Sequence, residues 1–90
     1  MVVLVHAVSS LAALEALWRH ELVHERLTVA SATAVPSGKQ VTVRLEMPGP
    51  SLELIGTVRG ARPDGEGFAI DVAVAISRAQ RDTLRKLADF

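Results

Sequence analysis

The sequence predicts an α+β fold that is mostly β, a small antiparallel β-barrel with an early helix and a C-terminal capping helix. Apolar residues alternate with polar ones over 41–47, 52–59 and 68–72, which is the period of half-buried strands. Short segments rich in proline and glycine separate these strands, so consecutive strands are expected to pair antiparallel. Apolar residues at helical spacing before and after them predict the two helices.

The N-terminal third of the chain predicts a strand, a helix and a second strand. Residues 2–8 form a continuous, largely β-branched run that is typical of a strand covered on both faces. Ser9 or Ser10 can cap a helix over about 10–24, where leucines follow at helical spacing. A short strand is expected over 27–31.

The rest of the chain predicts a three-strand meander and a closing helix. Gly56 interrupts the middle strand and predicts a bulge or a tight bend. Ser77 and Gln80 have the spacing of a capping box, so an amphipathic helix should begin there. The residues predicted to point into the core, or to cover one opening of the barrel from the closing helix, are Val41, Val43, Leu45, Met47, Leu52, Leu54, Val58, Phe68, Ile70, Val72, Leu84 and Leu87.

Composition and charge exclude several classes of protein. The chain has 90 residues, 49% of them hydrophobic, and ten Lys and Arg residues balance ten Asp and Glu residues. These values argue against a disordered chain and against a nucleic-acid-binding protein that relies on bulk positive charge. The absence of cysteine excludes disulfides and thiolate metal sites. No segment reaches the ~20 apolar residues of a membrane helix, and no signal peptide is recognised, so a cytoplasmic protein is expected.

The segment His20-Glu-Leu-Val-His24 matches H-E-x-x-H. On a helix this spacing places two imidazoles on one face to bind zinc, with the glutamate as general base. Leu27 and Ala30 stand where the extended zinc-protease motif has glycine and histidine, and no third ligand is evident. We therefore predict no catalytic residue, no metal and no cofactor, and interpret the segment as the solvated end of an amphipathic helix. A zinc hydrolase is the weakest of the alternatives.

Several short patterns, in a specific order, carry a resemblance to a known family. They are Leu14-Glu-Ala-Leu-Trp18 in the early helix, Met47-Pro-Gly49 at a strand end, Leu52-Glu-Leu-Ile-Gly-Thr-Val58, the hairpin Gly65-Glu-Gly-Phe68, and Arg81-Asp-Thr-Leu-Arg-Lys-Leu87. Their order over nearly the whole chain resembles a PilZ domain, particularly the divergent, myxobacterial-type PilZ-like domains. The resemblance implies a single PilZ-like domain over 1–90, a small β-barrel and a role in bacterial signalling.

PilZ domains are best known as receptors for cyclic di-GMP, which the family binds through R-x-x-x-R ahead of the barrel and D/N-x-S-x-x-G on an early strand. This chain departs from both motifs. Arg19 and Arg26 are seven residues apart, and residues 21–26 have Glu, Val and Arg where the family has Asp or Asn, Ser and Gly. The resemblance thus implies a degenerate cyclic di-GMP site, and no nucleotide-binding residue is carried over. A functional cyclic di-GMP receptor is the alternative.

A domain without its ligand site is expected to act through its surface, as a regulatory or protein-interaction module and not as an enzyme. The expected partner is another protein or an adjoining domain of the same chain, and a homo-oligomer would also cover an apolar first strand. Nucleic acid and membrane are not expected. The interface is predicted on the first strand and early helix, with candidate residues Trp18, Arg19, His20, His24 and Arg26.

Two structural alternatives accompany this interface prediction. Trp18 can instead fill the core beneath the early helix. Arg78, Arg81, Arg85 and Lys86 give the last helix a mildly basic face, which we interpret as a solvated surface, with an acidic partner as the alternative.

Overall fold

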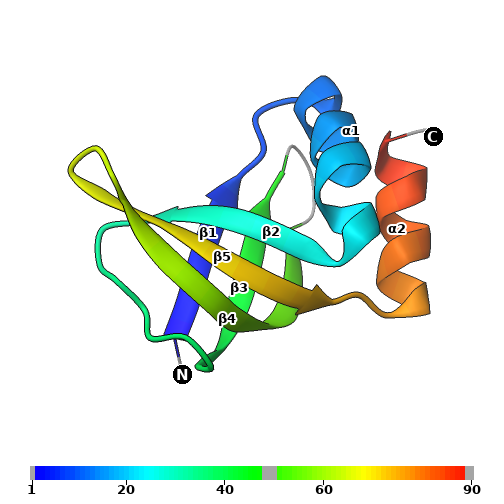
Figure 1. Cartoon of the computed structure of the whole chain (residues 1–90). Coiled ribbons are helices and arrows are strands. Elements are labelled where there is room, and N and C mark those ends of the chain that lie inside the picture. Colours follow the sequence, from blue (N-terminus) through cyan, green and yellow to red (C-terminus); the bar gives the residue numbers. More distant parts are fainter. Residues whose placement is uncertain (1, 48–50, 89–90) are drawn as a thin grey trace.

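A computed structural model describes residues 2–47 and 51–88, so the turn predicted at 48–50 lies outside the described residues. Five strands form one curled sheet, a half-barrel with the order β1-β3-β4-β5-β2, and two helices lie at one end of it (Figure 1). The elements in chain order are β1 (Val2–Ala7), α1 (Leu11–His20), the 3-10 helix η1 (Leu22–His24), β2 (Arg26–Ser31), β3 (Gln40–Glu46), β4 (Leu52–Asp64), β5 (Gly67–Ala75) and α2 (Arg78–Ala88). The predicted order of strands and helices is confirmed.

The sheet is mixed, so the prediction of a fully antiparallel barrel is wrong at its first strand. β3, β4, β5 and β2 pair antiparallel, whereas β1 pairs parallel with β3, from Val2 opposite Val41 to Ala7 opposite Glu46. The cause is the route of the chain. After β2 it returns to the end of the molecule where β1 begins, and β3 starts there and runs beside β1 (Figure 1). β1 and β2 are the sheet edges, and no ladder joins them among the described residues.

The hydrophobic core lies on the inner face of the curled sheet. The predicted core residues that are buried are Val41, Val43, Leu45, Leu54, Val58, Ile70, Val72 and Leu84. Met47, Leu52, Phe68 and Leu87 are only partly buried against this core. Phe68 lies next to the β4–β5 hairpin, which projects away from the helices (Figure 1), so the end of the sheet that holds it has no helix to cover it.

The early helix begins where the sequence predicts and ends sooner. Ser10 Oγ accepts a hydrogen bond from Ala13 N–H at 3.1 Å, which confirms an N-cap. α1 ends at His20 and not near residue 24, because the chain must turn into β2. Glu25 takes the left-handed conformation with φ 57°, and its carbonyl accepts a hydrogen bond from Val74 N–H at 2.9 Å. The turn thereby aligns β2 with β5.

The closing helix has the predicted capping box. Gln80 N–H donates to Ser77 Oγ at 3.1 Å, and Ser77 N–H donates to Gln80 Oε1 at 3.0 Å. Gln80 Nε2 also donates to the Glu53 carbonyl at 2.7 Å, which attaches the start of α2 to β4. α2 lies beside α1 at the end of the half-barrel (Figure 1), and Leu84 is fully buried there.

Gly56 does not mark a bulge, contrary to the sequence-based expectation. It pairs regularly with both neighbouring strands, and the register shift of β4 lies between Val58 and Gly60. A Cβ at position 56 would lie 2.5 Å from Val72 Cγ1 and 2.9 Å from the Ala73 carbonyl oxygen. Close packing on the inner face therefore requires glycine here.

Candidate functional site

The H-E-x-x-H segment spans the end of a helix and not a continuous helix. His20 is the last residue of α1, His24 lies in η1, and both side chains are exposed. The carboxylate between them faces the sheet, because Glu21 Oε1 accepts a hydrogen bond from Thr28 N–H at 2.9 Å. Thr28 belongs to the edge strand β2, so Glu21 satisfies an amide that the sheet leaves unpaired.

This geometry differs from the one that the zinc motif requires. The motif requires two imidazoles on one face of a continuous helix, which α1 does not provide. Within residues 2–47 and 51–88, no group of three or more His, Asp or Glu side chains is placed to hold a metal ion. Glu21 instead connects the end of α1 to the sheet edge, which is a structural role.

Trp18 lies between the two helices and is neither fully buried nor fully exposed. Part of its side chain packs against the core. On the other side, the guanidinium carbon of Arg81 lies 5.6 Å from the centroid of the indole ring, within the range of a cation–π interaction. Trp18 therefore packs partly against the core and partly reaches the surface, and its role at an interface stays a prediction.

Arg19 and His20 follow Trp18 at the exposed end of α1. Arg19 Nη2 lies 2.7 Å from Glu15 Oε1, one helical turn earlier, and the two side chains are 69% and 41% exposed. An ion pair this exposed contributes only about 0.3–0.5 kcal/mol, so a binding partner can replace Glu15 at small cost. Trp18, Arg19 and His20 thus occupy the last three positions of α1, and Arg19 and His20 are exposed.

His24 and Arg26 lie on a second surface. With Glu25 they line a hollow of about 420 Å³ on the outer side of the sheet, which Arg59 of β4 and Asp71 of β5 also line. The sequence analysis missed Arg59. The alternation along β4 places its side chain on the polar face of the strand, but only the curled sheet shows that this position lies near the start of β2.

The outer face of β1 is exposed, so the expectation of a strand covered on both faces is wrong. Leu4 points into the core, but Val3 and Val5 are each 45% exposed. Both helices lie at the end of the half-barrel and not over this face (Figure 1). Among the described residues, β1 has a ladder partner only on its β3 side. A continuous apolar run therefore marks an edge strand here, in place of a central one.

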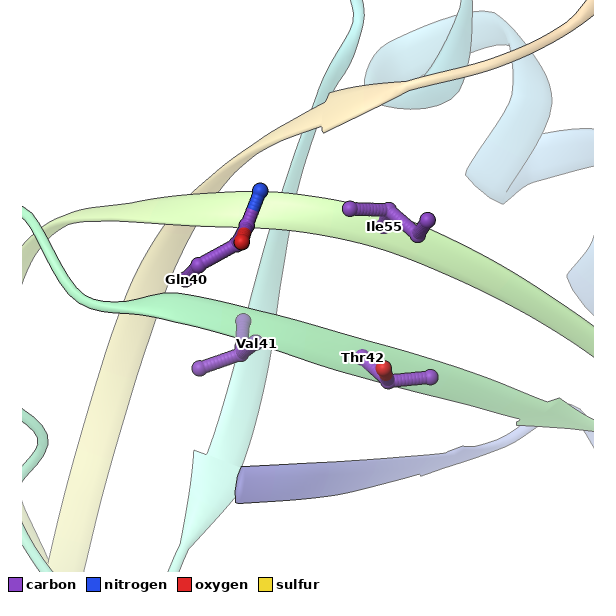
Figure 2. Close-up of a pocket in the computed structure, with 4 residues that line it drawn as sticks. All are labelled: Gln40, Val41, Thr42 and Ile55. Carbon is purple, nitrogen blue, oxygen red and sulfur yellow. The ribbon is translucent and has the colours of Figure 1, made fainter. Parts of the chain in front are cut away.

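Next to β1, the outer face has a small hollow of about 100 Å³ between β3 and β4. Figure 2 shows the residues that line it, Gln40, Val41 and Thr42 from β3 and Ile55 from β4. Thr42 is paired across the sheet with Val3 and with Ile55, and Ile55 is 59% exposed. Three exposed aliphatic side chains, Val3, Val5 and Ile55, thus share the outer face of β1 and β4.

No protein-family model and no curated protein matches this chain. None of the helices in the described ranges is long and apolar enough to cross a membrane. The chemistry of the exposed surfaces is therefore the basis for a functional proposal.

Proposed function

We propose that this chain is a degenerate PilZ-like domain that works as a regulatory or protein-interaction module in bacterial signalling, in the cytoplasm and without binding cyclic di-GMP. The order of strands and helices supports the proposal, since it is the order that suggests the resemblance. The curling of the five strands into a half-barrel supports it as well, because a small barrel is the fold that the resemblance implies.

One observation carries the proposal of protein binding: Trp18 is partly exposed between α1 and α2, with Arg81 over its ring. Tryptophan and arginine are the residue types most enriched at binding hot spots, since each combines a large contact area with directional hydrogen bonding. Arg19 and His20 add two exposed side chains at the same end of α1. A partner at this junction would bury the exposed edge of the indole and pair with the cations around it.

The residues that line the hollow near Arg26 argue against binding of cyclic di-GMP. Arg26 and Arg59 both line it, and a pair of guanidinium groups is the one feature that favours the receptor alternative. Glu25 and Asp71 line the same hollow. Two carboxylates beside two guanidinium groups leave no excess of positive charge for a ligand with two phosphates.

Calorimetric titration of the purified domain with cyclic di-GMP tests the second part of the proposal. We expect no saturable heat of binding at micromolar nucleotide. Saturable binding at low micromolar concentration would establish the receptor alternative, and Arg59→Ala would then be the variant that locates the site.

Affinity capture tests the first part. Proteins from an extract of the source organism are retained on the immobilised domain and quantified by mass spectrometry. The Arg19→Glu/His20→Glu variant changes the helix end, and Arg44→Glu/Gln40→Glu is a matched control that makes the same charge change at exposed positions of β3. We expect a protein that the wild type and the control retain and the helix variant loses. Equal retention by both variants, or none by the wild type, would contradict protein binding at this surface.

A further inference from the structure

Charge is divided unevenly between the helices and the rest of this neutral chain. α1 and α2 together contain five Lys or Arg residues and two Asp or Glu residues. The other described residues contain five and seven, respectively. The two helices lie side by side at one end of the half-barrel (Figure 1), so their net positive charge is concentrated there, whereas the other described segments carry a net negative charge.

Three of these cations form a stripe along α2. Arg78, Arg81 and Arg85 are spaced by three and four residues, which places them on one face of the helix. Arg78 and Arg85 are exposed, and none of the three forms an ion pair with a described residue. Arg81 lies over Trp18, so the stripe passes beside the partly exposed indole.

We infer that this basic stripe, together with Trp18, binds an acidic segment of a partner protein. The inference rests on the proposed function and specifies the chemistry of its partner. Carboxylates of the segment would pair with Arg78, Arg81 and Arg85, and an apolar side chain would contact the exposed edge of Trp18. Charge complementarity of this kind accelerates association and selects against basic partners.

The dimensions of the stripe favour a protein segment over other polyanions. From Arg78 to Arg85 the helix rises about 10 Å, which matches a few residues of an extended peptide. A nucleic acid would extend beyond the helices and meet the acidic remainder of the molecule, which repels it. A single indole also provides no series of stacking platforms for bases.

Fluorescence anisotropy with a labelled probe tests the inference. The probe is a short peptide of Glu and Asp residues with one central Leu, titrated with the purified domain at low ionic strength. The Arg78→Glu/Arg85→Glu variant reverses the stripe, and Arg44→Glu/Arg62→Glu makes the same charge change at exposed positions of β3 and β4. Because all four side chains are exposed, both variants should keep the fold, which circular dichroism checks.

We expect the stripe variant to bind the probe about tenfold or more weakly, the control within about twofold of the wild type, and salt to weaken all binding. Equal losses in the two variants would show that net charge alone attracts the probe, which would overturn the inference. Tighter binding of a DNA duplex or of phosphatidylserine vesicles than of the peptide would overturn it as well. If affinity capture yields a partner and the probe does not bind, the inference fails while the proposed function stands. If affinity capture yields no partner and the peptide does not bind, both the inference and the proposal of protein binding fail.

Discussion

The two-helix end and the outer face of the sheet are both exposed surfaces. They differ in that the exposed side chains at the helix end contact residues that pack against the core. At the helix end, Arg81 rests on Trp18, which itself packs against the core, and Leu84 on the same helix is fully buried. On the outer face, Val3 and Ile55 point into solvent from a regular ladder. Substitutions at the helix end should therefore change stability and surface chemistry together, whereas the outer face should tolerate change.

The largest effect is expected from Leu84→Ala, which removes the buried side chain beneath α2. Because Leu84 is fully buried, the loss of packing and the resulting cavity should lower the free energy of unfolding by about 2–5 kcal/mol. Leu11→Ala is the matched control, since Leu11 is 55% exposed at the start of α1. Urea denaturation measures both. Similar losses in the two variants would mean that α2 does not cover the core.

Gly56→Ala tests how closely the inner side of β4 packs against β5. A methyl group at 56 would meet Val72 and the backbone of Ala73, so we expect a loss of about 1–3 kcal/mol in thermal or urea unfolding. Gly60→Ala is the control, because no atom of a described residue beyond its chain neighbours lies within 4 Å of a Cβ there. If Gly60→Ala lowered the free energy of unfolding and Gly56→Ala did not, the close packing assigned to residue 56 would be contradicted.

Ser77→Ala tests the anchoring of α2 and should have a smaller effect. Loss of the N-cap hydroxyl leaves Gln80 N–H without its partner and should lower the free energy of unfolding by about 1 kcal/mol. Ser9→Ala, an exposed serine ahead of α1, provides the reference. No difference between the two variants in urea denaturation would show that the capping box does not stabilise the domain.

Ile55→Thr should have the smallest effect of all. The side chain is 59% exposed, and threonine suits a strand, so the free energy of unfolding should stay within about 0.5 kcal/mol of the wild type. Retention of a captured partner should also be unchanged. A variant that folds normally and loses the partner would move the binding site to the outer face of the sheet.

Much of the fold follows from local sequence patterns. Alternation over 41–47 and 68–72 predicts the inner face, and Ser10 and Ser77 predict the starts of the two helices. The parallel pairing of β1 could not be predicted this way, since it depends on where the chain returns after β2. The role of Gly56 could not be predicted locally either. Position 56 requires glycine because the strand packs closely against β5, which the sequence around residue 56 does not reveal.

The candidate site was less accessible to sequence analysis. Trp18 and Arg19 could be selected as surface candidates from the early helix alone. The position of Arg81 over Trp18 depends on the packing of α2 beside α1, which no local pattern contains. The helical repeat of Arg78, Arg81 and Arg85 is visible in the sequence, but its place beside the indole is a property of the tertiary structure.

Hydrogen exchange of the domain alone and with its captured partner tests most directly the claim that the partner binds at the two-helix end. We predict slower amide exchange in α1, η1 and α2 when the partner is bound, with exchange in β1 and β3 unchanged. Protection confined to β1 and β3 would contradict this claim, because the partner would then cover the exposed outer face of the sheet around Val3, Val5 and Ile55.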